Sequence, residues 1–251
     1  MTYDVIVTTV HDRADLLERT LRSMLAQLDP LPRRVIVHED VRAGQPFDPG
    51  RTEVALVAAA RSGVEFVHLQ RNPGQGLGRA VLRLLEEART DFVLYTQEDF
   101  DFLRPIPVGR CLDVMERNDL WHVRWNKRKT EWCKGEDRPE AERFYKCEFT
   151  VGDSENRGVI ICASDHWYFQ ASLWRRDVAL EGFRHVAASG PVVRCEERFN
   201  GWLNARQGCV GAELLDGYAR AAKCRTFIWG PVKEPAFIRH TGGERHSQGW
   251  R

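Results

Sequence analysis

Short apolar runs alternate with helical stripes over the first hundred residues of the chain. Runs of the length and composition of buried strands fall at residues 5–7, 34–38, 64–69 and 92–96. Apolar residues at helical spacing follow the first and third runs, and a short Ala-rich segment at 53–61 is expected to be helical. Strands and helices that alternate over short links predict an α/β fold built on a mostly parallel, doubly wound, Rossmann-like sheet.

The stretch 64–103 has the clearest pattern. A strand leads into a turn rich in Asn and Gly, a helix with one apolar face follows, and a second strand ends in Glu98-Asp99-Phe100-Asp101. Ligands of open α/β sheets bind at the carboxyl ends of strands. Carboxylates gathered there repel one another unless a cation lies among them, and oxygen ligands favour Mg²⁺ or Mn²⁺.

The run RNPGQGLGRA, followed by a helix and a strand closed by EDFD, resembles the donor half of a GT-A glycosyltransferase. It is most similar to the large inverting family 2, in which a D-x-D pair holds a sugar nucleotide through a divalent metal. The resemblance implies that Asp101 is a direct metal ligand and that Asp99 belongs to the same site, where it holds the ribose or a metal-bound water. It also implies that the turn contributes to donor binding through Asn72, Gly76 and Arg79. The alternative is an acidic surface loop that caps a helix.

The ends of the first two predicted strands carry further polar residues. The first reads TVHDR and the second closes with ED, where family 2 has a polar turn and an acidic pair that contacts the nucleoside. The resemblance implies that the base and ribose are lined by Thr9, Arg13, Glu39 and Asp40. A carboxylate suits this role because it accepts the imide N–H of uracil or a ribose hydroxyl. A solvated strand end is the alternative for the acidic pair.

The second half of the chain resembles the acceptor side of the same family. Residues 120–134 alternate aromatic and basic side chains, and 167–183 matches the segment that precedes the catalytic helix. We expect the acceptor to be contacted by Arg124, Trp125, Lys127 and Trp167. Basic residues interleaved with aromatic ones suit an anionic or stacked acceptor. The alternative for 120–134 is a solvated edge strand kept from pairing by its lysines.

An acidic pair at Glu196-Glu197 stands where family 2 enzymes carry their general base, commonly as the second member of Glu-Asp. The resemblance implies Glu197 as the base, but the longer side chain leaves Glu196 open, and an acidic first helical turn is the alternative. GT-A enzymes often add a histidine near the C-terminus as a metal ligand. His240 matches that position best, with His246 as the fallback, and Arg245 is expected to close over the diphosphate.

Composition restricts the class of protein. The chain has 251 residues with 37 basic and 36 acidic side chains, so its net charge of +1 gives no global affinity for polyanions. Seven Cys without a C-x-x-C pair favour free thiols in a reducing compartment. We see no signal peptide and no apolar run near the roughly 20 residues of a membrane span, and expect a cytoplasmic protein. The first strand lacks the G-x-G-x-x-G turn of dinucleotide-binding proteins.

The sequence therefore predicts one GT-A domain over 1–251, with a donor half at 1–103 and an acceptor half and tail at 104–251. The expected reaction moves a hexose from a nucleotide sugar, with a UDP-sugar as the first choice, to an acceptor hydroxyl with inversion, assisted by Mn²⁺ or Mg²⁺. The acceptor is open between a glycan, a small molecule, a protein and hydroxymethylated DNA. Alternatives are a metal-dependent nucleotidyltransferase and a non-catalytic module that binds sugar nucleotides.

Overall fold

The computed structural model describes residues 1–41, 48–61, 63–71, 75–125, 148–155, 157–163, 167, 169–188, 195–207, 225–230 and 235–241. Its centre is a nine-stranded sheet with the order β4-β3-β1-β5-β11-β8-β12-β10-β9. No helix in these ranges is both long enough and apolar enough to cross a bilayer.

Four parallel strands from the first hundred residues form one side of this sheet. They are β1 (Asp4–Val10), β3 (Arg34–Asp40), β4 (Glu65–Arg71) and β5 (Phe92–Gln97). The helices between them are α1 (Ala14–Gln27), α2 (Pro49–Ala59) and α3 (Leu77–Glu87). The strands and helices predicted for this half are therefore confirmed, and the carboxyl ends of its strands meet at one edge of the sheet.

The second half of the chain extends the same sheet. It contributes β8 (His122–Trp125), β9 (Glu148–Gly152), β10 (Gly158–Ala163), β11 (Ser172–Arg175) and β12 (Thr226–Trp229). β11 runs antiparallel to β5 and to β8, β12 runs parallel to β8, and β10 runs antiparallel to β12 and to β9. All strands except β10 and β11 therefore share one direction, and the mostly parallel sheet predicted from the sequence is confirmed.

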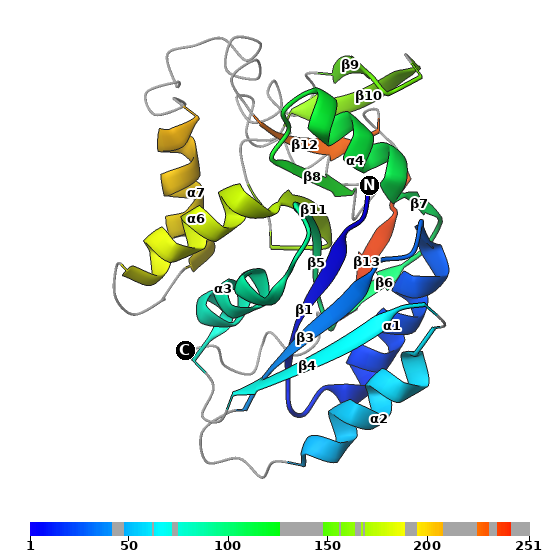
Figure 1. Cartoon of the computed structure of the whole chain (residues 1–251), viewed down its shortest axis with the longest axis vertical. Helices are drawn as coiled ribbons and strands as arrows, with labels where there is room; N and C mark the ends of the chain where they lie inside the picture. The colour runs from blue at the N-terminus through cyan, green and yellow to red at the C-terminus, as the bar shows by residue number, and fades with distance from the viewer. Residues whose placement is uncertain are drawn as a thin grey trace, which may run out of the picture.

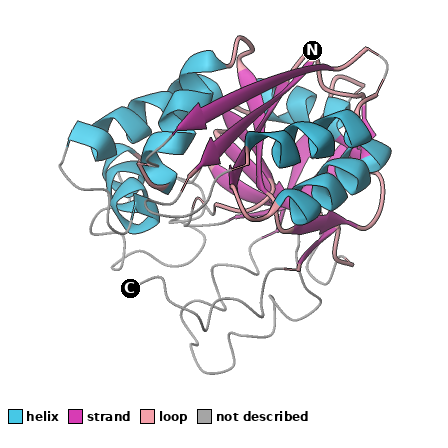
Figure 2. Ribbon diagram, turned by 90° about the horizontal axis from the view of Figure 1, so that it is seen from below, coloured by secondary structure: helices cyan, strands magenta, loops and turns pink. Residues whose placement is uncertain are grey.

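Helices cover both faces of the sheet, and Figure 2 shows them in two groups with the strands between. The β1 side chains alternate between two hydrophobic cores: Val5 and Val7 pack with the residues of α1 and α2, whereas Ile6 packs against α3. The first core also includes α4 (Val108–Arg117), and the second also includes α6 (Arg176–Ala188) and α7 (Cys195–Arg206). This is the doubly wound arrangement that the alternation of strands and helices predicts.

Two small ribbons complete the described fold. β2 (Leu28–Asp29) pairs with β7 (Ile106–Pro107), and β6 (Phe100–Phe102) pairs antiparallel with β13 (Ile238–His240). Figure 1 shows β13, in red, beside β6 and next to the central strands. A segment near the end of the chain is thereby placed beside the acidic residues that follow β5.

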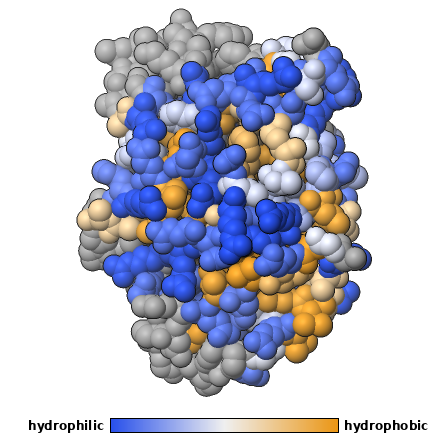
Figure 3. Space-filling view, viewed as in Figure 1, coloured by the Kyte–Doolittle hydropathy of each residue, from blue (hydrophilic) through white to orange (hydrophobic). Residues whose placement is uncertain are grey.

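The outer surface of α2 carries two exposed valines. Val54 and Val57 have 67% and 77% of their surface exposed, and Figure 3 shows the apolar side chains gathered over this helix at the lower right. The inner face of the same helix buries Ala55 and Leu56 in the first core. The helix is thus held by its buried face, and the exposed valines contribute little to its stability.

β8 corrects one expectation from the sequence. Its alternating pattern favoured a solvated edge strand, but the strand lies between β11 and β12 and all four of its residues are buried. β11 itself was not predicted from the sequence. A strand that acquires neighbours on both sides from distant parts of the chain becomes central whatever its local pattern suggests.

Candidate functional site

The candidate site lies where β1, β3 and β5 end. In the parallel register Val10 is opposite Asp40, and Thr8 is opposite Gln97. The residues that follow β1 and β5 and the last residues of β3 therefore gather at one edge of the sheet. This edge brings together most of the acidic residues that the sequence marks as functional.

Arg13 pairs with the acidic tip after β5. Its Nη1 lies 2.6 Å from Glu98 Oε1 and 3.8 Å from Asp99 Oδ2. Burial and the neighbouring Asp99 raise the pKa of Glu98 to about 7, although the Arg13 charge opposes this rise. Arg13, which was predicted to line the donor site, thus lies among the acidic residues and offsets part of their negative charge.

Asp99 and His240 come together from distant parts of the chain. His240 Nε2 lies 3.1 Å from Asp99 Oδ2, and Thr241 donates its backbone N–H to the Asp99 carbonyl at 2.8 Å. Asp99 is 4% exposed, and its Oδ1 is buried without a hydrogen-bond partner in the described part of the chain. A buried carboxylate oxygen left in this state fits a cation, and an adjacent imidazole is a common second ligand.

Asp101, the other half of the predicted D-x-D pair, is not part of this arrangement. Its Oδ2 pairs with Arg239 Nη2 at 2.6 Å and also with Arg19 of α1. The three residues predicted for the metal site therefore do not converge, and the described residues contain no group of three or more His, Cys, Asp or Glu placed to hold a metal. The metal set that the geometry favours is Asp99 with His240, to be completed by groups of the ligand and water.

Glu39 is enclosed by protein groups, which corrects its predicted contact with the nucleoside. Thr52 Oγ1 donates to Glu39 Oε1 at 2.5 Å, and Oε2 lies 3.1 Å from His68 Nε2 and 3.2 Å from Gln70 Nε2. Burial alone raises the pKa of Glu39, but these hydrogen bonds outweigh it and the pKa lies below its usual value. Both oxygens are engaged, so Glu39 orients its neighbours instead of facing a ligand.

Asp40 points to the other face of β3. Its Oδ2 accepts the backbone N–H of Gly76 at 2.9 Å, which ties the end of β3 to the start of α3. Gly76 has φ +83, a conformation that residues other than Gly rarely adopt. Asp40 Oδ1 is buried without a hydrogen-bond partner among the described residues, and His38 Nδ1 lies 3.5 Å away. Asp40 is thus a second acidic residue at this edge with one carboxylate oxygen that accepts no hydrogen bond from the described residues.

Two of the remaining predicted donor residues, Thr9 and Arg79, lie in the described part of the chain. Thr9 is buried, and its hydroxyl donates to the Val10 carbonyl at 3.4 Å. Arg79 lies on the exposed side of α3. Asn72 and Arg245 fall outside the described residues. Their contact with a donor stays a prediction.

The acidic pair Glu196-Glu197 lies in the first turn of α7, and its role as general base stays a prediction. Glu196 is half-buried and its Oε1 accepts the Phe169 backbone N–H at 3.4 Å, whereas Glu197 is exposed. The Phe169 ring packs 6.2 Å from that of Tyr95, two residues before the end of β5. The start of α7 therefore lies beside the carboxyl part of β5, and the choice between the two glutamates stays open.

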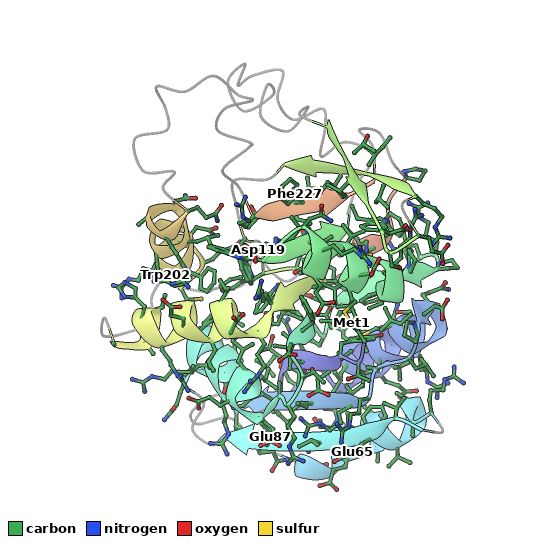
Figure 4. The ribbon with its side chains drawn as sticks, turned by 45° about the horizontal axis from the view of Figure 1, so that its top comes forward. Met1, Glu65, Glu87, Asp119, Trp202 and Phe227 are labelled. Carbon is green, nitrogen blue, oxygen red and sulfur yellow. The ribbon has the colours of Figure 1, made fainter. Side chains whose placement is uncertain are left out.

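Close packing fixes α7 against α6. A Cβ at Gly182 of α6 would lie 2.4 Å from Phe199 and 2.6 Å from Trp202, both on α7. Figure 4 labels Trp202, which lies on the side of α7 toward α6. Only a glycine allows the two helices to approach this closely, so Gly182 positions the glutamates at the start of α7.

The predicted acceptor residues are corrected in part. Trp125 and Trp167 are fully buried, so they pack in the protein interior and do not line an open groove. Trp167 stacks on His122 with ring centroids 4.9 Å apart. Arg124 is 5% exposed, and Lys127 lies outside the described residues. Trp125 was predicted to line the acceptor groove because it alternates with basic residues, and Trp167 because its segment resembles the acceptor side of family 2.

Sequence reasoning missed the residues that support the acidic ones. Thr52, His68 and Gln70 hold Glu39, and Arg19 and Arg239 hold Asp101. His68 and Gln70 are two positions apart on β4, so a period of two could have placed them on one face beside Glu39. The contact of Arg239 with Asp101 joins residues 138 positions apart and has no local signal.

Comparison with known proteins supports the fold. A scan against protein-family models finds no match, and neither does a search of curated proteins. Solved structures do match. Residues 1–349 of Staphylococcus aureus TarS with UDP-GlcNAc match with a TM-score of 0.56 and 15% identity, over 100% of this chain and 62% of that one. The mannosyltransferase PcManGT from Pyrobaculum calidifontis with GDP-Man and Mn²⁺ matches with a TM-score of 0.50 and 16% identity, over 75% of this chain and 46% of that one.

A longer TarS structure matches with a TM-score of 0.56 and 13% identity, over 96% of this chain and 37% of that one. The chain thus spans less than two thirds of each of these proteins. At such identities the likeness concerns the fold, which is the α/β fold of GT-A-like glycosyltransferases.

Proposed function

We propose that this protein is a nucleotide-sugar glycosyltransferase with an inverting, family 2-like mechanism. The observation that carries the proposal is a pair of buried carboxylate oxygens, Asp40 Oδ1 and Asp99 Oδ1, without hydrogen-bond partners among the described residues. They lie at the ends of β3 and β5, on either side of β1. Unpaired buried acceptors are rare in proteins and call for a partner beyond the described residues, which a bound nucleotide and cation would supply.

The spacing of these two oxygens suits a nucleoside diphosphate. β3 and β5 are separated by one strand, so their ends are roughly 10 Å apart at about 4.8 Å per strand. Asp40 would accept a base N–H or a ribose hydroxyl, and the diphosphate would extend toward Asp99. TarS has been solved with UDP and UDP-GlcNAc, which favours a UDP-sugar, and PcManGT with GDP-Man keeps a GDP-sugar as the second choice.

Asp99 and His240 would hold the divalent cation, Mn²⁺ or Mg²⁺. When bound, it neutralises the negative charge that develops on the departing nucleoside diphosphate. The chain prepares this position by placing Asp99 Oδ2 3.1 Å from His240 Nε2. Arg13, 3.8 Å from the same carboxylate, limits the repulsion between Asp99 and the buried Glu98.

The attacking hydroxyl of the acceptor needs a base on the side opposite the leaving group. Glu196 or Glu197, at the start of α7, would take this proton, since a carboxylate within hydrogen-bond reach is sufficient. A single displacement with one base inverts the anomeric centre. A hexose is the expected group transferred. The acceptor is a glycan, a small molecule, a protein or modified DNA, and contacts from Lys127 remain part of this proposal.

A donor screen with product analysis tests the proposal. Thermal shift and calorimetry with UDP, GDP and other nucleoside diphosphates, with and without Mn²⁺, should identify one base that binds, because a ligand stabilises the folded state by mass action. Incubation with the matching nucleotide sugar should release nucleoside diphosphate. Release of pyrophosphate from a nucleoside triphosphate would indicate a nucleotidyltransferase, and tight binding with no turnover on any acceptor would indicate a binding module.

A further inference from the structure

β13 is a three-residue strand whose ends are tied to the chain around β6. Leu103 donates its N–H to the Phe237 carbonyl at 2.8 Å, and Thr241 donates its N–H to the Asp99 carbonyl at 2.8 Å. These hydrogen bonds join backbone atoms, so they do not depend on which side chains the strand carries. In so short a ribbon the register must be specified by side chains, because a slip of one residue moves every side chain to the opposite face.

Asp101 supplies this specification. It is 6% exposed and accepts from Arg239, its direct neighbour across the ribbon, at 2.6 Å. Neighbouring residues of a strand point to opposite faces. With Arg239 on the Asp101 face, His240 must take the other face, where its ring lies 5.2 Å from that of Phe100 and its Nε2 reaches Asp99.

The alternative register would be unfavourable for both faces. A slip by one residue would bring His240 toward Asp101 and would aim Arg239 at the Asp99 face. A second guanidinium beside Asp99, in addition to that of Arg13, would place a further permanent positive charge where the proposed function needs a cation. The pairing of Arg239 with a nearly buried carboxylate therefore favours the register that leaves Asp99 and His240 together.

We infer that Asp101 is a positioning residue: through Arg239 it sets the register of β13 and aims His240 at Asp99, and it does not itself bind the metal. The register lock rests on the described contacts alone. Its consequence for metal binding rests on the proposed function. The second half of the D-x-D sequence thus serves the site through the strand that carries the histidine.

Arg19 provides a matched control for Arg239. Both guanidiniums pair with Asp101 Oδ2, and their side chains are 53% and 59% exposed. Arg19 belongs to α1, so losing it removes a contact to the same carboxylate without releasing β13. The pair Arg239→Gln and Arg19→Gln therefore separates a register lock from a general loss of charge around Asp101.

The first test measures Mn²⁺ affinity by calorimetry in the presence of the nucleoside diphosphate that the wild type binds. Loss of a residue that orients a metal ligand typically weakens metal affinity by about ten- to a hundredfold, and we expect this for Arg239→Gln and for Asp101→Asn. The double variant should be no weaker than either single one, because all three break one contact. Arg19→Gln should change the affinity by no more than about twofold, because Arg19 is not part of β13 and its loss leaves the pairing of Arg239 with Asp101 in place.

The inference is overturned if Arg239→Gln binds Mn²⁺ like the wild type while Asp101→Asn loses binding, since Asp101 would then be a direct ligand. A second measurement needs no metal: hydrogen exchange of the backbone amides at 238–240. Exchange should be faster in Arg239→Gln and Asp101→Asn than in the wild type and Arg19→Gln. Arg239→Gln carries this test alone if Asp101→Asn does not fold.

The two measurements separate the inference from the proposed function. If the wild type binds no Mn²⁺ with any nucleotide, the metal part of the proposed function fails and the exchange rates alone decide on the register lock. Unchanged exchange in Arg239→Gln overturns the lock whether or not the metal binds. Faster exchange with unchanged Mn²⁺ affinity would keep the strand contact but reject its role in positioning His240.

Discussion

Replacing Asp40 by Asn tests the donor pocket at a single atom. In the wild type, Asp40 Oδ2 accepts from Gly76 N at 2.9 Å, and Oδ1 is buried without a hydrogen-bond partner among the described residues, with His38 Nδ1 3.5 Å away. Asn has the same shape, so its carbonyl oxygen can keep the contact to Gly76. Its amide group would then occupy the position of Oδ1 and present N–H donors where the proposed nucleoside needs an acceptor.

The expected loss of nucleotide affinity in Asp40→Asn follows from the loss of one charged hydrogen bond. Such a bond contributes about 1.5–3 kcal/mol, and each 1.4 kcal/mol is a factor of ten in Kd, so nucleotide affinity should fall by about ten- to a hundredfold. Stability should not fall with it, because the contact to Gly76 is retained and no unpaired charge remains buried. Asp40→Ala should lose both affinity and stability, the latter by about 1 kcal/mol for the lost contact at the start of a helix.

The assay is calorimetric titration with the nucleoside diphosphate that the wild type binds, combined with urea unfolding. Asp177→Asn serves as the control: Asp177 Oδ1 accepts the Val178 N–H at 2.8 Å in the first turn of α6, so it carries a similar local contact. α6 follows the antiparallel β11 and therefore starts at the opposite edge of the sheet. An unchanged Kd in Asp40→Asn would refute the reasoning and place the base pocket elsewhere.

Three further predictions address the metal, the base and the packing. Asp99→Asn should abolish the gain in nucleotide affinity on adding Mn²⁺, measured by titration; a gain equal to that of the wild type would contradict its role as a ligand. Of Glu196→Gln and Glu197→Gln, one should reduce kcat by about 10²–10⁴-fold with nucleotide Kd retained, and two fully active variants would exclude both as base. Gly182→Ala should cost about 1–3 kcal/mol in urea unfolding through overpacking, whereas Gly201→Ala, with nothing within 4 Å, should not destabilise.

The strands of the first half could be predicted from the sequence because their pattern is local. Each is a short apolar run followed by a helix with one buried face, and this is enough to define a parallel sheet and its functional edge. The predicted boundary of β3 was less accurate, and this changes the site. The strand extends from residue 38 to Asp40, so Glu39 and Asp40 are part of it and alternate in direction. Two adjacent acidic residues thereby acquire different roles.

The second half could not be predicted to the same extent because its strands depend on distant partners. β8 pairs with β11, about fifty residues later, and with β12, about a hundred residues later. A period-two pattern predicts one exposed face only if no other layer covers it. Here His122 and Arg124 are buried beside Val123 and Trp125. Polar side chains on a strand therefore did not indicate exposure.

The acidic residues at the sheet edge differ in a way that only the structure reveals. Glu39, Glu98 and Asp101 are each satisfied by side chains of the protein, whereas Asp40 and Asp99 each keep one buried oxygen without a hydrogen-bond partner among the described residues. An unsatisfied buried acceptor costs about 1–3 kcal/mol in the free protein, and a ligand that pairs with it recovers that free energy on binding. Because the nucleoside would pair with one oxygen and the cation with the other, nucleotide and Mn²⁺ together should raise Tm more than either alone. Equal shifts with and without Mn²⁺ would show that only one of the two oxygens belongs to the binding site.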